Sequence, residues 1–383
     1  GYANSRHTIA VTAVTHYGEQ SWYAEPGANI LVAAPSDGAG EGITTTDNEG
    51  GGGYNNGDYN DDFGGTSSAT PLVSGVIALI LEANPSLTYR DVEHIIAHSA
   101  RQNDANDNSW GTNGAGHDVS HKYGFGVIDA SAAVALAENW NNVEEEISFQ
   151  SGLIDIQDIP IPDNSAPGVI ETKQVSDSIK VEHVEVIVDI DHSYRGDLAI
   201  TLTSPMGTQS LLSEKHEDSN NNLNDWMFTS VHHWDEDSYE TWTLSVEDQG
   251  NGDTGTFYDW ELNIYGTELN IDRDGDGLTN VDEDNLHGTD PDDIDTDDDQ
   301  INAGDEINIH GTNPLSSDSD NDGLDDGLEI LVNGTDPLDS DTDDDGLTDG
   351  AEVNIHNTNP LVPDLDQDTD TFYWFQDCND TNA

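Results

Sequence analysis

Residues 65–71, with the sequence GTSSATP, directly precede the apolar run at residues 72–81. A helix that begins here would place a serine hydroxyl in the partial positive charge of its N-terminus, and the small neighbours would let a substrate backbone approach. The alternative is an ordinary helix start, because hydroxyl side chains are common at N-caps and need no chemistry there. The small-residue turn with its hydroxyl directly before the apolar run suggests a nucleophile at the mouth of a buried helix.

Acidic residues recur with a 23-residue period in the last third of the chain. Four units follow or approach the pattern D-x-D-x-D-G-x5-E, which is the spacing of a calcium loop. Positions 1, 3 and 5 supply side-chain oxygens, glycine at position 6 allows a sharp turn, and glutamate at position 12 completes the shell. Several flexible carboxylates suit Ca²⁺ better than Mg²⁺, which demands tighter octahedral geometry. The predicted calcium ligands are Asp272, Asp274, Asp276, Glu283, Asp295, Asp297, Asp299, Glu306, Asp318, Asp320, Asp322, Glu329, Asp341, Asp343, Asp345 and Glu352.

Two units depart from this pattern. The second has Gln300 where glycine is expected, which weakens the prediction of its turn and its affinity. The fifth begins at Asp364 and matches less well. The alternative for the whole region is a disordered acidic tail, but the strict period and the interleaved Leu, Ile and Val favour stacked units.

Charge limits the partners of this 383-residue chain. Its 79 acidic and 9 basic residues give a net charge of −70, which excludes nucleic acid and anionic membranes as expected partners. Residues 267–383 hold 36 acids and one base, so they are more than twice as dense in charge as the rest, where a salt-adapted surface is the alternative explanation. The single cysteine, Cys378, cannot form an internal disulfide, so stability must come from core packing and from calcium. No apolar run approaches the expected length of a membrane span.

The first 146 residues carry the signals of an α/β region. Residues 8–14 and 28–35 are short, apolar, β-branched stretches typical of buried parallel strands. Residues 37–65 are rich in Gly, Asn and Asp, and we expect a loop, either a solvated connector or a lid near the serine. Thr88 and Asp91 predict a capped amphipathic helix, and an Ala-rich helix follows at residues 130–136.

Residues 147–266 change to an all-β pattern. Apolar and polar residues alternate at 184–190, 198–202, 242–246 and 260–264, which predicts half-buried strands of an antiparallel sandwich.

Residues 65–71 resemble the G-T-S-x-A-x-P motif of subtilisin-like proteases, in which Ser67 is the nucleophile and Ser68 the variable position. The segments LTYRDV at 87–92 and VSHKYGFG at 119–126 are similar to furin and kexin. The segment WYAE at 22–25 is similar to one whose glutamate helps to hold a structural calcium in that family. The resemblance therefore implies Glu25 as a further calcium ligand.

Later segments extend the resemblance. RGDLAI at 195–200, SPMGT at 204–208 and WDED at 234–237 resemble the P domain of proprotein convertases, which implies a jelly-roll-like sandwich. The acidic region resembles bacterial thrombospondin type 3 repeats. The predicted fold is multidomain. It comprises part of an α/β subtilisin-like domain at 1–146, an all-β P domain at 147–266 and a calcium-binding repeat array at 267–383.

A serine hydrolase of this class also needs a histidine base and an orienting aspartate, which precede the serine in subtilisins. His7 and His16 precede Ser67, but neither lies in the H-G-T context of the family, and the H-G-T at 310–312 belongs to the 23-residue repeat. We therefore expect a C-terminal part of a larger enzyme, with the upstream half of the catalytic domain elsewhere in the parent chain and with this part alone inactive.

The leading hypothesis is a secreted or surface-located bacterial calcium-dependent serine endopeptidase that acts on protein or peptide substrates. The resemblance implies cleavage after basic residues. The alternative, from another class, is a calcium-binding surface or adhesion protein whose protease-like region is degenerate.

Overall fold

Two parallel strands form the centre of the N-terminal region in the computed structural model, which describes residues 3–363. They are β1 (Ala10–Val14) and β2 (Ile30–Pro35), and nearly all of their residues are buried. Small and β-branched side chains suit strands that are covered on both faces. The expected parallel pair is confirmed. A short hairpin of β5 (Trp110–Thr112) and β6 (Asp118–Ser120) follows later in the chain.

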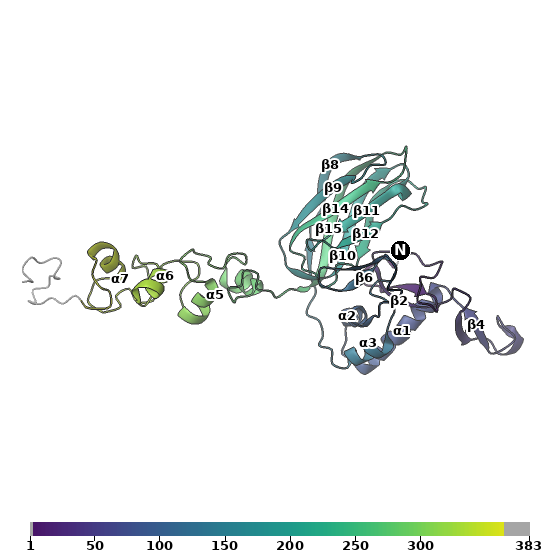
Figure 1. Ribbon diagram of the computed structural model, residues 1–383, viewed down its shortest axis with the longest axis horizontal. Helices are drawn as coiled ribbons and strands as arrows, with labels where there is room; N and C mark the ends of the chain where they lie inside the picture. Colours follow the sequence, from purple (N-terminus) through teal and green to yellow (C-terminus); the bar gives the residue numbers. More distant parts are fainter. Residues whose placement is uncertain (1–2, 364–383) are drawn as a thin grey trace, which may run out of the picture. The chain divides into compact units, whose positions relative to one another are not determined.

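Helices accompany the parallel pair, as the α/β prediction requires (Figure 1). They are α1 (Thr66–Ala83), α2 (Tyr89–Ser99) and α3 (Ala130–Ala137). Helices α1 and α2 pack against the strands, and α3 packs against α1 and α2. The predicted cap of α2 is confirmed, because Thr88 and Asp91 form a reciprocal capping box. Asp91 also accepts hydrogen bonds from the Trp140 indole and the Val143 backbone, which fixes the chain that leaves α3.

Helix α1 is not the fully buried helix that the sequence predicts. Only Ser68, Ala69, Val73 and Ile80 are buried, on the side that contacts β1, β2 and α3. Val76 and Ile77 are partly buried against the same core. Leu72, Leu79 and Leu81 are exposed, and the exposed fraction of Leu79 is 48%. A helix that is apolar all round is suited to burial on every side. The described residues cover only one side of it.

The length of α1 also corrects the expectation about membrane spans. Among residues 3–363 it is the one helix that is long and apolar enough to cross a membrane by length and composition, with 18 residues and a mean hydropathy of 1.4. Its contacts with β1, β2 and α3 are those of a helix packed within a folded domain.

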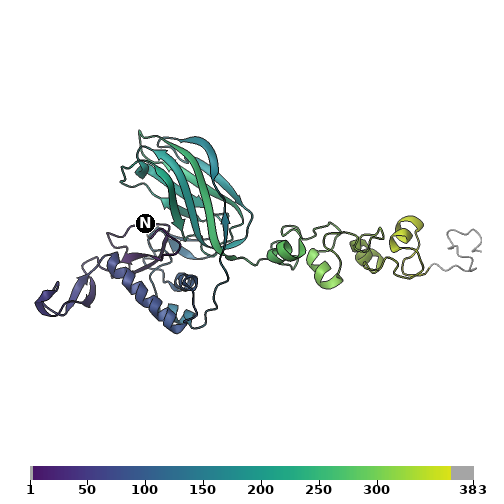
Figure 2. The same ribbon diagram turned by 180° about the vertical axis from the view of Figure 1, so that it is seen from behind.

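Residues 37–65 are not a loop throughout. β3 (Ile43–Thr46) pairs with β4 (Tyr59–Phe63) in an antiparallel hairpin, with a 3₁₀ turn at Gly50–Gly52. The hairpin projects from the α/β region in both views (Figures 1 and 2). Its strands are mostly exposed, so no alternating apolar pattern marks them. Backbone pairing and the Asp47 carboxylate, which accepts from the Asn48 and Asn55 backbone, hold the hairpin instead.

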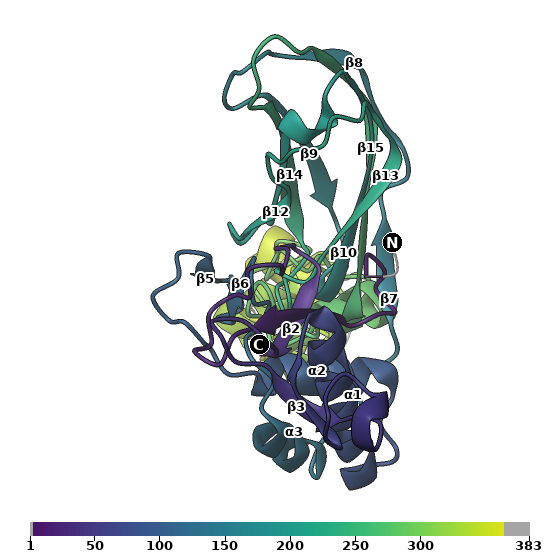
Figure 3. The same ribbon diagram turned by 90° about the vertical axis from the view of Figure 1, so that its right-hand side faces the viewer.

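A sandwich of two antiparallel sheets follows, and Figure 3 shows the sheets facing each other. The four strands expected from the sequence all form, within β10, β11, β14 and β15. One sheet has the order β13-β10-β15-β7, with β8 also pairing with β15, and the other has the order β12-β11-β14-β9. The strands are β7 (Ile147–Gln150), β8 (Ile154–Ile161), β9 (Val169–Val175), β10 (Ile179–His192), β11 (Leu198–Thr203), β12 (Gln209–Ser213), β13 (Leu223–Ser230), β14 (Glu240–Asp248) and β15 (Gly255–Glu268).

The α/β region and the sandwich share buried contacts within one compact unit, residues 1–269. Val231 and Trp234 belong to the turn after β13, yet they join the core formed by β2 and the helices. Arg90 on α2 donates to both carboxylate oxygens of Glu182 on β10, at 2.8 and 2.5 Å. The polar side of α2, which amphipathicity would place in water, is therefore buried against the sandwich.

Glu182 is expected to contribute strongly to the stability of this unit. Its side chain is 1% exposed, so Glu182→Ala leaves Arg90 buried without its partner and should lower the free energy of unfolding by about 3–5 kcal/mol. Urea unfolding measures the loss. Glu146→Ala is the matched control, because the Arg6–Glu146 pair is partly exposed and should cost about 0–1 kcal/mol. Equal losses in the two variants would contradict the expectation.

The pH dependence of this contribution has a defined sign. Burial alone would raise the pKa of Glu182, but hydrogen bonds from His94 and Arg90 hold it at about 2, below the ordinary 4.5. The stabilisation is therefore present above pH 4.5 and is lost as the pH falls toward 2.

The second unit, from Asn270 onward, is built of the acidic repeats. Each repeat has a loop followed by a short helical segment that ends at a left-handed residue, and Figure 1 labels three of them. Neighbouring repeats touch closely: the Gly304 backbone donates to the Asp276 carboxylate at 2.9 Å, and a Cβ at Gly304 would lie 2.2 Å from the Asp276 carbonyl oxygen. The helical segments are α4 (Asn280–Asp282), α5 (Ala303–Asp305), α6 (Asp326–Leu328) and α7 (Asp349–Ala351), continued by π turns at Glu283–His287, Glu306–His310, Glu329–Asn333 and Glu352–His356.

Candidate functional site

Ser67 lies at the second residue of α1, and it is exposed. Gly65 precedes the helix with φ of 80°, a left-handed conformation that favours glycine. Ser68, by contrast, is buried, and its hydroxyl lies 2.7 Å from the Ser36 hydroxyl and donates to the Gly65 carbonyl at 3.0 Å. Of the two adjacent serines, only Ser67 is therefore exposed to solvent.

Ser36 and Asp37, which directly follow β2, hold the turn that precedes Ser67. The Asp37 carboxylate accepts the Gly65 backbone N–H at 2.7 Å and the Tyr23 hydroxyl. Those hydrogen bonds, from Tyr23 first and then Gly65, lower the pKa of Asp37, so the anion is the stable form. Ser36 also donates to the Gly65 carbonyl, at 2.8 Å. This network fixes the direction of the Ser67 backbone N–H, the group that would bind an oxyanion.

Asp37 could not be predicted from the sequence, because nothing in its local pattern distinguishes it from other loop acids. Its partners Tyr23 and Gly65 are 14 and 28 residues away in the chain, so only the fold brings them to it.

Neither histidine that precedes the serine contacts it in the described residues. His7 packs edge-on against Tyr89, with ring centroids 5.7 Å apart, and His16 packs against Tyr17 at 3.9 Å. Within residues 3–363, therefore, neither His7 nor His16 is placed to act as the base for Ser67. His310, of the H-G-T sequence in the repeats, ends a π turn of the second unit.

Glu25 is exposed and lies at the rim of a cavity of about 400 Å³ between the α/β region and the sandwich. Glu214 and Asp218 of the sandwich line the same cavity. The assignment of Glu25 as a calcium ligand stays a prediction.

The repeats bring their predicted ligands together. In each of the first three units, oxygens of the carboxylates at positions 1, 3 and 5 lie within 4.8 Å of one another. The backbone N–H at position 6 donates to the position-1 carboxylate in all four units, for example from Gly323 to Asp318 at 3.0 Å and from Gly346 to Asp341 at 2.8 Å. The loops are therefore wound around a common centre of carboxylate oxygens. The fifth unit and Cys378 lie outside the described residues.

Among the predicted ligands, the glutamates at position 12 of the loops give the strongest support for a bound cation. Glu283, Glu306 and Glu329 are fully buried; one oxygen of each accepts a threonine hydroxyl, and the other has no hydrogen-bond partner within residues 3–363. Burial, followed by the charge of Asp297, raises the pKa of Glu306 to about 8. Buried carboxylates crowded by like charge are stable only when a cation or a proton neutralises them. Oxygen-rich, anionic and flexible, this donor set fits Ca²⁺.

Two ligand candidates escaped the sequence analysis. Asp326 is fully buried, and its carboxylate lies within 4.8 Å of those of Asp299 and Glu306 in the preceding repeat. Asp349 is equally buried and accepts from Thr342 as Asp326 does from Ser319. Both occupy position 9 of their loops, where calcium loops often carry a ligand, so the spacing could have identified them.

Gln300 adopts φ of 84°, close to the 96° of Gly323 at the same position of the next repeat. The turn forms despite the side chain, at a strain of about 1–2 kcal/mol. Because glycine loses more chain entropy on folding, by about 0.5–1 kcal/mol, Gln300→Gly should stabilise the repeat by a net of about 0.5–1 kcal/mol. Thermal unfolding in excess Ca²⁺ measures this gain. A lower melting temperature would contradict it.

Sequence families match three parts of the chain. Residues 2–126 match the Subtilase family, residues 181–264 the Proprotein convertase P-domain, and residues 272–293, 318–340 and 341–363 the Bacterial TSP3 repeat. The repeat that carries Gln300 lies outside these matches.

The chain is similar to curated convertases. It is 38% identical to "Furin-1" of Xenopus laevis over 294 residues, which is 73% of this chain and 36% of that protein. It is 38% identical to "Proprotein convertase subtilisin/kexin type 4" of Homo sapiens over 279 residues, 70% of this chain and 35% of that one. The chain thus spans about a third of the length of these relatives.

The chain is also similar to a solved structure. The serine protease of Aeromonas sobria superposes with a TM-score of 0.64 and 27% identity, over 67% of this chain and 57% of that chain.

Proposed function

The chain belongs to the subtilisin/kexin-like serine proteases, and we propose that it is part of a serine endopeptidase in which Ser67 is the nucleophile. The observation that carries the proposal is the exposed Ser67 at the N-terminus of α1, next to a Ser68 that is buried and already hydrogen-bonded. We assign residues 1–146 to the catalytic domain, 147–266 to the P domain and 267–383 to the repeats.

In the proposed reaction, the Ser67 hydroxyl oxygen attacks the carbonyl carbon of a peptide bond. The amine leaves with a proton, and water then hydrolyses the ester that remains on Ser67. The Ser67 backbone N–H, directed by Asp37 through Gly65, stabilises the oxyanion. The strongly negative chain suits a substrate that is basic around the cleavage site.

The base and its orienting aspartate are proposed to come from catalytic-domain residues outside this sequence. The outward-facing apolar side of α1 supports this, because Leu72, Leu79 and Leu81 are each at least 39% exposed and would be buried by further domain residues.

Labelling tests the proposal directly. A fluorophosphonate probe is applied to the protein that also carries the upstream catalytic residues, and the modified residue is identified by mass spectrometry. Modification of Ser67 is expected. Modification of another serine, or none in a folded protein, would refute the assignment.

We further propose that the repeats bind Ca²⁺ through their position-1, -3, -5 and -12 carboxylates, with Asp326 and Asp349 as additional ligands. In the first three repeats, buried glutamate oxygens that have no hydrogen-bond partner among residues 3–363 support this. A secreted or surface location fits the proposal, because extracellular calcium is abundant enough to fill sites of modest affinity.

A further inference from the structure

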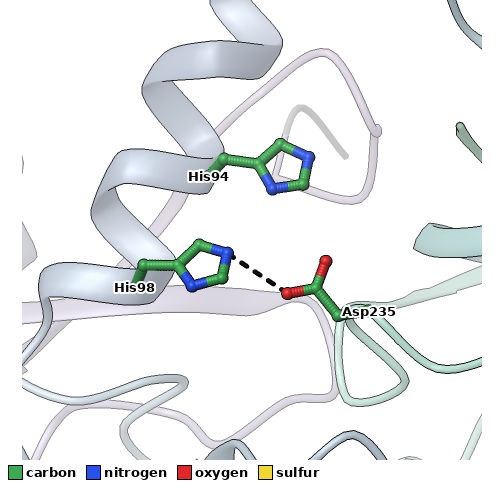
Figure 4. Close-up of side chains that lie close together, drawn as sticks. All are labelled: His94, His98 and Asp235. Carbon is green, nitrogen blue, oxygen red and sulfur yellow. Dashed lines mark ion pairs between the residues drawn. The ribbon is translucent and has the colours of Figure 1, made fainter. Parts of the chain in front are cut away.

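Two histidines of α2 lie one helical turn apart and face the sandwich. His94 and His98 are four residues apart, so they share a helix face, a spacing that suits two ligands of one metal ion. Asp235, from the turn between β13 and β14, lies opposite them (Figure 4). One donor atom from each of the three side chains lies within 4.8 Å of the other two.

A third histidine approaches the same carboxylate. His117, from the hairpin of β5 and β6, has its Nε2 2.7 Å from Asp235 Oδ2, and His98 Nε2 is 3.2 Å from that same oxygen. The rings of His98 and His117 have centroids 5.0 Å apart and are nearly perpendicular. Two imidazole nitrogens thus converge on one carboxylate oxygen.

Neighbouring residues orient His94 and Asp235, as the residues around a metal site orient its ligands. His94 Nε2 contacts Glu182 Oε1 at 2.9 Å, and Arg90 in turn holds Glu182. A metal-binding histidine usually has its second nitrogen paired with a carboxylate in this way. Figure 4 shows the other nitrogen of the His94 ring on the side facing His98. Lys180 Nζ lies 3.0 Å from Asp235 Oδ1, which leaves Oδ2 directed at the histidines.

We propose that His94, His98, His117 and Asp235 form a binding site for Zn²⁺ or a similar transition-metal ion. Nitrogen donors with one carboxylate match Zn²⁺ and do not match the oxygen-only preference of Ca²⁺, so this site is distinct from the repeats. The side chains of His98 and His117 are 30% and 21% exposed, which gives an ion access. A bound ion would join the α/β region to the sandwich.

The alternative is a set of His–Asp hydrogen bonds that never holds metal. Co²⁺ distinguishes the two, because four-coordinate Co²⁺ with nitrogen ligands absorbs visible light far more strongly than six-coordinate Co²⁺ with oxygen ligands. The whole chain is first saturated with Ca²⁺ to occupy the repeats and is then titrated with Co²⁺. We expect a visible band that saturates at one Co²⁺ per chain and disappears on addition of one equivalent of Zn²⁺.

Variants locate the site. His98→Gln and His117→Gln should each weaken Co²⁺ binding by at least about tenfold. His216→Gln is the control, since His216 is exposed on the sandwich and its Nδ1 contacts its own backbone at Glu214. Circular dichroism confirms that each variant is folded. Absence of the band from the unmodified protein, or a band unchanged in both folded variants, would overturn the proposal, and neither result depends on protease activity.

Discussion

Substitution of Ser67 by alanine is expected to reduce peptide hydrolysis by about a millionfold in the protein that carries the whole catalytic domain. The nucleophile, its base and the orienting acid act as a unit, so removing one member costs nearly as much as removing all three. The residual rate comes from oxyanion binding and substrate positioning, which the substitution leaves in place. Initial rates on a chromogenic peptide with a basic residue before the scissile bond measure the loss.

Ser68→Ala is the matched comparison. It removes a buried hydroxyl that bonds to Ser36 and the Gly65 carbonyl, so it should cost about 1–3 kcal/mol of stability without removing the nucleophile. Activity that survives in Ser67→Ala but disappears in folded Ser68→Ala would assign the chemistry to the other serine.

Removal of Ca²⁺ is expected to unfold the repeats and to expand the protein. Residues 267–383 carry 36 acidic residues and one basic residue, so without bound cations their carboxylates repel one another. The folding free energy of such small units is largely metal-binding free energy. Described residues 270–363 would approach the radius of gyration of an unfolded chain of this length, about 30 Å. Small-angle scattering or dynamic light scattering of the whole chain, with and without chelator, measures the change.

Controls separate specific sites from general screening. Mg²⁺ should restore compactness poorly because of its strict octahedral geometry, and Glu306→Gln should weaken Ca²⁺ binding by at least about tenfold. In about 1 M NaCl the Debye length falls to about 3 Å, so salt that compacts the chelated chain as fully as Ca²⁺ would indicate screening alone. A radius unchanged by chelation would contradict the prediction.

The sequence was sufficient to predict a feature wherever one short segment contains all the residues that determine it. The acidic repeat loops are such segments, because five or six residues within twelve positions supply the turn and the clustered carboxylates. The cap of α2 is another, since Thr88 and Asp91 are three residues apart. The alternating strands of the sandwich were predictable for the same reason, as burial of one face imposes a period of two.

Prediction from the sequence failed where the interacting residue lies far away in the chain. It also failed where two strands pair without an alternating pattern of apolar and polar side chains. The hairpin of β3 and β4 is held by backbone bonds and is mostly exposed, so its polar residues indicated a loop. Helix α1 was expected to be buried, but its composition does not say which of its sides the chain covers.

The sequence by itself predicted Ser67 as the nucleophile and determined the family and the period of the acidic repeats, because each depends on neighbours a few residues apart. Only the tertiary structure decided which distant residues contact these segments. It brought Asp37 beneath Gly65, Glu182 onto Arg90, and Asp235 between His98 and His117, across separations of 28, 92 and more than 100 residues. The physical reason is burial: a charged side chain removed from water must find a partner, and the fold supplies that partner from a distant segment.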